Sequence, residues 1–336
     1  MKSVILILLV FNSYSVFSQK AGKYSAKGDD KFDSHDYKEA IVNYTKAIQI
    51  DPNNPYAYDN RGTAKLKLKN YEGAIVDFTK AIKIDSNYSK AYFGRGNAKS
   101  YLGNYREAIA DYSKTIEIDS MDKDAYKSRA TAKSYLGNYR SAIADDSKAI
   151  ELNPKDAELY LNRGLTKYEL GDRRGAIKDY SKAIEIDSKV KGAHKSRGIA
   201  KYELKDYRGA IADYNKAIAV SPKNMEGYYN RGLAKYTLGD YRGAVADYSK
   251  AIELNPNSEE AYAGRGNSKL KSKNYKGAIE DYSKVIKLDP SNETGYKDRG
   301  IAKLLLGNKD GACLDLSKAG ELGSATAYEL IGKYCN

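Results

Sequence analysis

The sequence predicts an all-α solenoid built from tandem helical hairpins, and three observations support this prediction. One pattern recurs every 34 residues, as the step from Gly62 to Gly96 shows, and it is cleanest over residues 231–256. Each copy contains two stretches whose apolar residues follow helical spacing, and a short break, such as Gly239-Asp240, separates these stretches. A fixed period of this length is typical of repeats that bury their apolar faces on their neighbours.

Each copy is expected to form one helical hairpin. In the copy that starts at Met225, residues 226–238 and residues 241–252 both show apolar residues at helical spacing. Gly239 lies in the break between them. Pro256 ends the copy, because proline cannot continue a helix and moves the preceding residue out of helical geometry.

This pattern resembles the tetratricopeptide repeat (TPR) family. The shared markers are an aromatic residue at the fourth, seventeenth and twenty-fourth positions, Gly or Ala at the eighth, Ala at the twentieth and twenty-seventh, and Pro at the thirty-second. In this frame nine repeats, numbered one to nine below, start at Ala21, Pro55, Ser89, Lys123, Ala157, Lys191, Met225, Glu259 and Glu293. The resemblance implies a right-handed α-α superhelix in which the first helix of each repeat lines the concave side.

The two ends of the chain depart from the repeats. We expect a signal peptide over residues 1–18, a solenoid over residues 19–322 and a C-terminal capping helix over residues 323–336. The apolar run from Val4 to Phe11 follows Lys2 and is too short to span a bilayer, whereas small Ser18 suits a cleavage site. The alternative is an ordinary first helix. The mature protein is therefore expected to be exported (periplasmic, cell-envelope or secreted), without an integral membrane segment.

The only two cysteines lie near the C-terminus. Cys313 falls early in the second helix of the last repeat, and Cys335 falls at the end of the expected cap. An antiparallel turn near Gly323 would bring them to similar heights, so a disulfide is favoured in an oxidising compartment. Two small buried thiols are the alternative, because the sequence does not show the direction of the side chains.

The basic charge is distributed with the repeats. The formal net charge is +13, and Lys occupies the eleventh position of all nine repeats. Arg at the seventh position and Asp at the twenty-third, such as Arg231 and Asp247, are both present in eight repeats and both absent from repeat one. This pattern predicts a ladder of Arg-carboxylate pairs between paired helices; independently solvated charges inherited by duplication are the alternative. Charge spread in this way, together with export, disfavours a nucleic-acid partner.

The sequence shows no catalytic constellation, and no enzyme activity, metal or cofactor is expected. The two histidines, His35 and His194, lie in different repeats, and His194 is interpreted as filling the space of an aromatic residue. In repeat four, Asp146 stands where a buried Tyr is expected, and Ala130 stands where Gly is expected. We interpret this pair as local drift, with a functional acid as the alternative.

The family resemblance implies a binding surface on the first helices, at positions two, five, six, nine, twelve and thirteen. In repeats five to seven these positions are aliphatic, aromatic and amide residues, which favours a peptide-docking groove. The expected groove residues are Leu161, Asn162, Leu165, Tyr168, Ile199, Tyr202, Tyr229, Asn230, Leu233 and Tyr236. Earlier repeats offer polar residues such as Thr131 and Ser134, with Tyr101 and Tyr135. The alternative is that the rings pack against the next repeat and are not free.

The favoured function is a non-catalytic exported scaffold that binds an extended peptide or a helix of another protein in its concave groove. The rival is a cell-envelope binder of acidic glycan or lipid surfaces through distributed basic charge, which salt should weaken steeply. Some family members bind a partner's C-terminal carboxylates, and Lys127, Thr131 and Asn162 begin that pattern. Gly192 and Ser196 do not complete it, so a receptor for chaperone tails is not expected. A cytoplasmic location would reopen nucleic-acid and chaperone partners.

Overall fold

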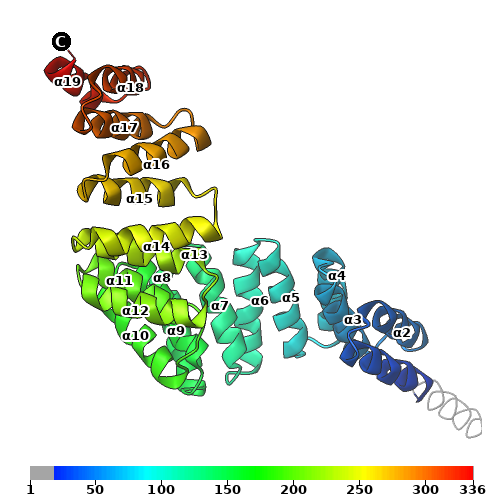
Figure 1. The fold of residues 1–336 in the computed structure, drawn as a ribbon. Coiled ribbons are helices and arrows are strands. Elements are labelled where there is room, and N and C mark those ends of the chain that lie inside the picture. Colours follow the sequence, from blue (N-terminus) through cyan, green and yellow to red (C-terminus); the bar gives the residue numbers. More distant parts are fainter. Residues whose placement is uncertain (1–18, 336) are drawn as a thin grey trace, which may run out of the picture. The chain divides into compact units, whose positions relative to one another are not determined.

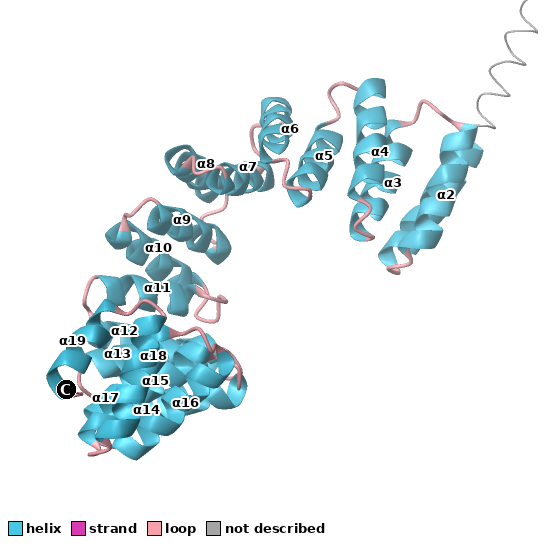
Figure 2. Cartoon of the chain, turned by 90° about the horizontal axis from the view of Figure 1, so that it is seen from above, coloured by secondary structure: helices cyan, strands magenta, loops and turns pink. Residues whose placement is uncertain are grey.

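The computed structural model describes residues 19–335, and every regular element within them is an α-helix (Figures 1 and 2). The predicted signal peptide at residues 1–18 lies outside the described residues. A helix over residues 19–33 is followed by α2 (Tyr37–Ile50), α3 (Pro55–Lys67), α4 (Tyr71–Ile84), α5 (Ser89–Tyr101), α6 (Tyr105–Ile118), α7 (Lys123–Tyr135), α8 (Tyr139–Leu152), α9 (Ala157–Glu169), α10 (Arg173–Ile186), α11 (Ala193–Glu203), α12 (Tyr207–Val220), α13 (Met225–Thr237), α14 (Tyr241–Leu254), α15 (Glu259–Lys271), α16 (Tyr275–Leu288), α17 (Glu293–Leu305), α18 (Lys309–Glu321) and α19 (Ala325–Tyr334). The all-α solenoid prediction is confirmed.

The chain divides into two compact units, Met1–Leu170 and Gly171–Asn336, and each is described by itself. In both units the two helices of a repeat pack on each other, and the second helix then packs on the first helix of the next repeat, as α7, α8 and α9 do. First helices of neighbouring repeats also contact each other: α3 with α5, α5 with α7, α7 with α9, α11 with α13, and α13 with α15. The first helices therefore lie on the inner side of each stack.

Local chemistry sets the helix boundaries. The side chain of Asp240, the N-cap of α14, accepts a hydrogen bond of 2.9 Å from the backbone N–H of Gly243, which satisfies one free donor of the first turn. Gly239, just before it, has a φ of +83° and lets the chain turn between α13 and α14. Lys205 holds the equivalent place in repeat six with a φ of +65°, which costs a residue with a Cβ about 1 kcal/mol.

In repeats one, two, three, six, seven and eight, the core forms where a ring lies over a glycine. In repeat seven, a Cβ added at Gly232 would come within 3.2 Å of the Tyr248 ring, and in repeat six a Cβ at Gly198 would come within 2.6 Å of Tyr214. A larger residue at the eighth position would therefore displace the ring at the twenty-fourth. These rings are fully or almost fully buried, and small alanines surround them.

The predicted Arg-carboxylate ladder is confirmed wherever both partners lie in one unit. In repeat two, Arg61 Nε donates to Asp77 Oδ2 at 2.9 Å and Arg61 Nη2 donates to Asp77 Oδ1 at 2.7 Å. The same two-pronged contact joins Arg95 to Asp111, Arg129 to Asp145, Arg197 to Asp213, Arg231 to Asp247, Arg265 to Asp281 and Arg299 to Asp315. The aspartates are buried, so these pairs fix how the two helices of a repeat align.

The ladder also joins neighbouring repeats, and the spacing of the residues does not predict this contact. Arg129 Nη1 donates to the Ser113 hydroxyl of the preceding repeat at 3.0 Å, and its guanidinium lies 5.5 Å from the centre of the Tyr126 ring. The lysine at the eleventh position completes the cluster, because Lys133 Nζ lies 2.7 Å from Asp145 Oδ2. Each aspartate thus holds two cations, and one of these cations also contacts the repeat before.

The last helix of the described residues is α19. Helix α19 packs on α18, and its Ala327 joins a buried cluster with Leu316 and Ala319. Cys313 and Cys335 form a disulfide, with their Cα atoms 5.7 Å apart. The bridge ties the end of α19 to the start of α18.

Candidate peptide-binding surface

We call the inner surface at positions two, five, six, nine, twelve and thirteen of the first helices the first-helix face. In the N-terminal unit, four of the expected groove residues lie on it, all in α9: Leu161, Asn162, Leu165 and Tyr168. Leu165 is 42% exposed, and the other three are half-buried. Asn162 and Leu165 line a common cavity, which is described below.

In the C-terminal unit, the expected groove residues Ile199 and Tyr202 lie on α11 and are half-buried. Both pack against a buried cluster that contains Tyr214. The Tyr202 hydroxyl lies 3.1 Å from Thr237 Oγ1 on the first helix of the next repeat. This ring is therefore partly engaged with its neighbours, in the way that the alternative interpretation describes.

The remaining expected groove residues lie on α13 and are also half-buried: Tyr229, Asn230, Leu233 and Tyr236. The Tyr229 ring meets the Tyr248 ring edge-on, with centroids 5.6 Å apart. Burial raises the pKa of Tyr229 and also that of Tyr236. These side chains line the face and at the same time form part of its packing.

The most exposed rings of the first-helix face lie in repeats three and four. Tyr101 is 65% exposed and Tyr135 is 68% exposed. Each stacks on a tyrosine of the preceding repeat, with centroids 5.2 Å apart for Tyr71 and Tyr101, and 4.7 Å apart for Tyr105 and Tyr135. Their sequence signal was a Tyr at the thirteenth position, but the sequence does not show that the stack leaves so much of the ring in solvent.

A cavity of about 590 Å³ opens on this face beside Tyr135. Thr131, Ser134, Tyr135, Tyr139, Asp146, Asn162, Leu165, Thr166 and Glu169 line it, so it lies within the N-terminal unit. Asp146 is only 1% exposed. The cavity thus combines a buried carboxyl with aromatic and aliphatic groups.

A second cavity, of about 310 Å³, lies near the start of the N-terminal unit around Asp29. Asp29 accepts hydrogen bonds from the hydroxyls of Tyr44 and Tyr56, at 2.8 and 3.0 Å, and from the amide of Asn60 at 2.9 Å. Burial and the bond to Asp29 raise the pKa of Tyr44 well above its usual value. Three donors of the chain itself therefore surround this carboxylate.

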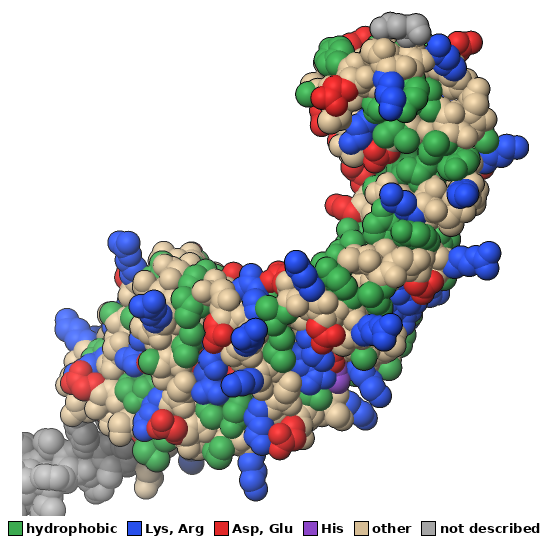
Figure 3. All heavy atoms as spheres, turned by 90° about the vertical axis from the view of Figure 1, so that its left-hand side faces the viewer, with side chains coloured by type: hydrophobic (Ala, Val, Ile, Leu, Met, Phe, Trp, Pro, Cys, Tyr) green, Lys and Arg blue, Asp and Glu red, His purple; other side chains and the backbone are tan. Residues whose placement is uncertain are grey.

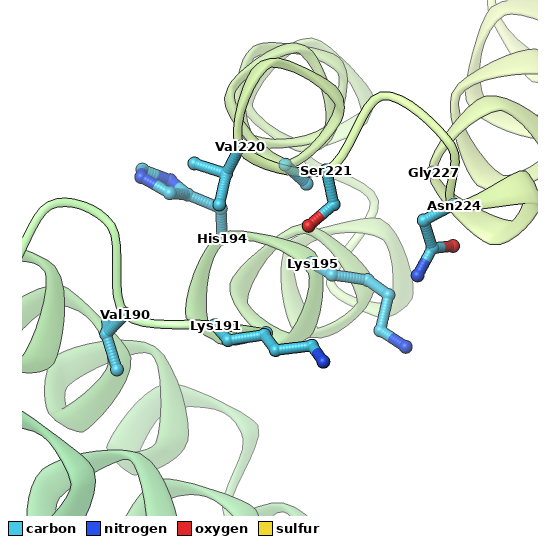
Figure 4. Close-up of a pocket in the computed structure, with 10 residues that line it drawn as sticks. Val190, Lys191, His194, Lys195, Val220, Ser221, Asn224 and Gly227 are labelled. Atoms are coloured by element: carbon cyan, nitrogen blue, oxygen red, sulfur yellow. The ribbon is translucent and has the colours of Figure 1, made fainter.

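A third cavity, of about 100 Å³, lies where α11 begins (Figure 4). The side chains of Lys191 and Lys195 extend along one side, whereas the ring of His194 points away from them. His194 Nδ1 is buried and lies 3.7 Å from Asp213 Oδ1. His194 thus fills the place of an aromatic residue beside the Arg-carboxylate ladder.

Basic side chains are scattered over the surface seen in Figure 3, with acidic side chains among them. Much of this charge is already paired: besides the ladder, Lys114 Nζ lies 2.6 Å from Glu117 and Lys148 Nζ lies 2.8 Å from Glu151. Among residues 19–335 there is no cluster of His, Cys, Asp and Glu that could hold a metal ion. Nor does that part of the chain contain a helix both long and apolar enough to cross a membrane.

The fold and this surface define a class of protein, the helical-hairpin solenoid with an inner face of side chains suited to contact a partner. Models of the TPR repeat match residues 28–69, 134–171 and 198–239, and models of the tetratricopeptide repeat match residues 55–88, 89–122, 157–190, 226–258 and 259–292. The chain belongs to the tetratricopeptide repeat family, a family of protein-interaction scaffolds.

Solved structures share the fold. The C-terminal part of a TPR repeat-containing protein from Cytophaga hutchinsonii has a TM-score of 0.60 and 21% identity, over 71% of this chain and 98% of that one. A TPR protein from Parabacteroides merdae has a TM-score of 0.55 and 21% identity, over 74% of this chain and 99% of that one. PilF of Pseudomonas aeruginosa has a TM-score of 0.54 and 19% identity, over 62% and 94%. No curated protein matches the chain.

Proposed function

We propose that this protein is an exported, non-catalytic scaffold that binds an extended peptide segment of another protein along the first-helix face. The observation that supports this proposal most strongly is the exposed apolar surface on that face, namely Tyr101, Tyr135 and Leu165. Large exposed rings on a rigid helical framework are typical anchors for a peptide, because they bury much area and lose little conformational freedom. Within the C-terminal unit, the half-buried tyrosines of α11 and α13 form a surface of the same kind.

The rival function, binding to acidic glycan or lipid surfaces, needs free basic charge. The pairing described above weakens this rival, since the eleventh-position lysines from Lys65 to Lys303 that have a described partner are held by the ladder aspartates. An ion pair leaves little net field for a distant polyanion at physiological salt. Peptide binding through apolar anchors is therefore the better supported of the two.

The test uses residues 19–336 to select peptides from a random twelve-residue library, followed by affinity measurements on the selected peptides. A Tyr101→Ala/Tyr135→Ala variant should bind them at least about tenfold more weakly, as expected for loss of two aromatic anchors. A matched variant, Tyr168→Ala/Tyr202→Ala/Tyr236→Ala, measures the contribution of the sequence-predicted groove. Affinity should change by less than about threefold between 50 and 500 mM salt. Binding only to heparin or anionic vesicles, and only at low salt, would favour the rival.

Export is part of the proposal, and the disulfide between Cys313 and Cys335 supports it, because such bridges persist in oxidising compartments. The test is to express the whole chain with a C-terminal tag and determine its N-terminus and location. A chain that begins at Gln19 outside the cytoplasm is expected. An uncleaved chain in the cytoplasm would refute export without affecting the peptide-binding proposal.

A further inference from the structure

A series of basic side chains in the C-terminal unit has no partner within the described residues. The eighteenth position of repeats five to eight is basic in every case, and these residues are Arg174, Arg208, Arg242 and Lys276. We call them the arginine column. All four are exposed, and none forms a hydrogen bond, an ion pair or a ring contact with another residue between 19 and 335. In repeat nine the same position is Asp310, so the column ends there.

The other recurring basic positions differ, because much of their charge is used within the chain. The arginines at the seventh position and the lysines at the eleventh bind the ladder aspartates in the pairs described above. At the twenty-sixth position, Lys182, Lys250 and Lys318 pair with the glutamates three residues later, at 2.6, 2.6 and 2.9 Å. The arginine column is therefore a recurring positive charge that no acidic side chain of the described residues pairs with.

The column lies where a cation does not help the fold. Each member is the second residue of its helix, in α10, α12, α14 or α16, and none of these helices has an acidic residue in its first turn. The start of a helix carries a partial positive charge, so a cation is less favourable there than an anion. An acidic ligand that binds at these four helix starts would remove this disadvantage.

The nearest acids in the sequence are used as helix caps. Asp172, Asp206 and Asp240 precede the three arginines by two residues, and each accepts a hydrogen bond of 2.9 Å from the backbone N–H of the glycine three residues later. Residues two apart on a helix do not face each other, so these acids do not pair with the column. In repeat eight the cap is the uncharged Asn274.

The spacing of the column favours an extended acidic segment. Directly packed helices lie about 8–10 Å apart, and a first helix packs between the second helices of neighbouring repeats, as α11 packs on both α10 and α12. Neighbouring members of the column are therefore roughly 10–13 Å apart, which is the length of three or four residues of extended chain. A carboxylate at every third or fourth residue can meet one cation in each repeat, and a guanidinium group can bind it with two parallel hydrogen bonds.

An evenly charged polyanion fits the column less well. The caps Asp172, Asp206 and Asp240 place a negative charge near each arginine of the column. A sulfated polysaccharide or an anionic lipid surface presents charge without gaps, so it meets like charge in each of these repeats. A peptide can instead place uncharged residues beside the caps.

We propose that the arginine column is a second docking surface, which binds an extended acidic segment of a partner protein with Asp or Glu at every third or fourth residue. The column lies on second helices, whereas the proposed peptide groove lies on first helices. This inference therefore goes beyond the proposed function and does not depend on it. The protein thus holds two segments of different chemistry, one through aromatic anchors and one through ion pairs.

The experiment selects the random twelve-residue peptide library at about 50 mM salt against residues 19–336 of four chains. They are the native sequence, a column variant, a control variant and the tyrosine variant, with the substitutions Arg208→Gln/Arg242→Gln/Lys276→Gln, Lys182→Gln/Lys250→Gln/Lys318→Gln and Tyr101→Ala/Tyr135→Ala respectively. The control removes the same charge from lysines that are already paired. Fluorescence anisotropy then compares each selected acidic peptide with its Glu→Gln or Asp→Asn counterpart.

We expect the native chain, the control variant and the tyrosine variant to select peptides with Asp or Glu at every third or fourth residue. The column variant should not select them and should bind them at least about tenfold more weakly, as expected for the loss of three exposed ion pairs. The uncharged counterparts should bind the native chain at least about tenfold more weakly. Raising the salt to about 500 mM should also weaken native binding at least about tenfold, unlike binding in the groove.

The outcomes that would overturn the column differ from those that test the groove. Acidic peptides that are absent from the native selection, or that the column variant binds equally well, would refute the column, whereas the groove is judged by its own apolar peptides. Acidic peptides that only the tyrosine variant fails to bind would place them in the groove and also refute the column. Binding to heparin or anionic vesicles that only the column variant loses, without any acidic peptide, would assign these cations to a polyanion instead.

Discussion

Repeats four and seven show how one framework can carry two different surfaces. Their helices have equal lengths, α7 and α13 of 13 residues and α8 and α14 of 14 residues. Both repeats have the ladder contact, at 2.8 Å between Arg129 Nε and Asp145 and 2.9 Å between Arg231 Nε and Asp247. Yet repeat seven buries a tyrosine where repeat four has a cavity. The ladder therefore maintains the hairpin, and the residue at the twenty-fourth position can differ between repeats without loss of the hairpin.

The rings of the first-helix face differ in the same way between the two repeats. Tyr135, at the thirteenth position, stacks on Tyr105 of the preceding repeat with only 7° between the ring planes. Tyr236, at the twelfth position, meets Tyr241 of its own repeat at 60° and is half-buried. A shift of one residue rotates a side chain by about 100° around a helix, which changes its packing partner. The exposure of a tyrosine on this face therefore changes when its position in the helix shifts by one residue.

Breaking the ladder should have the largest effect, and it should be equal in the two repeats. Asp145→Ala and Asp247→Ala each leave an arginine and a lysine without their buried partner, so the free energy of local unfolding should fall by about 3–5 kcal/mol. Hydrogen exchange of α7 and α8, and of α13 and α14, measures the two losses separately. Glu151→Ala and Glu253→Ala, which break exposed pairs on the same second helices, should have no measurable effect. A large loss in only one repeat would mean that the ladder is not the shared framework.

Truncating the twenty-fourth position should instead separate the two repeats. Tyr248→Ala removes a ring that is 2% exposed and should cost about 3–5 kcal/mol. Asp146→Ala removes a smaller side chain that borders an existing cavity, so it creates less new empty space and should cost less than Tyr248→Ala. Hydrogen exchange of α14 and α8 again provides the measurement. Equal losses would show that Asp146 is a packing residue like Tyr248.

Reducing the disulfide should affect the C-terminal unit alone. The bridge closes a segment with a sequence separation of 22, and its loss should lower the stability of α18 and α19 by about 3 kcal/mol. Urea unfolding followed by exchange in these helices, with and without reductant, measures the change. Repeat four provides the internal control, since it contains no cysteine. In a Cys313→Ser/Cys335→Ser variant, the stability of these helices should be the same with and without reductant. This control excludes a general effect of the reagent.

The smallest expected effect is the coupling within repeat four. Asp146→Tyr alone should strain the repeat against the methyl group of Ala130, and adding Ala130→Gly should relieve that strain by about 1–2 kcal/mol. Ala130→Gly by itself should cost about 1 kcal/mol, because glycine disfavours the interior of a helix. A double-mutant cycle from urea unfolding gives the coupling. Strict additivity would contradict the idea that these two positions changed together for a physical reason.

Much of the fold follows from the sequence because the repeat multiplies each signal. Gly232 and Tyr248, or Arg231 and Asp247, recur at fixed spacing in neighbouring repeats, so helix pairing and the ladder could be predicted. Contacts between repeats were missed. The bond from Arg129 to Ser113 of the preceding repeat and the role of Lys133 in the ladder depend on side-chain directions that spacing alone does not give.

The candidate site was predicted less well. The expected groove residues Tyr202 and Tyr236 lie on the first-helix face but are half-buried, and whether they bind a partner stays a prediction. The unusual pair Ala130 and Asp146 by itself predicts only local drift, because the sequence does not show that the missing ring leaves an open cavity. A residue that departs from the repeat pattern can be interpreted only when the positions of the side chains around it are known.

The most direct test of the central claim is to refill the cavity. The Ala130→Gly/Asp146→Tyr variant gives repeat four the pattern of repeat seven, and its free energy of unfolding is measured against that of the native chain. If the ladder maintains the hairpin whatever residue stands at the twenty-fourth position, the variant should fold at least as stably as the native chain. A clear loss of stability in the refilled variant would contradict the account.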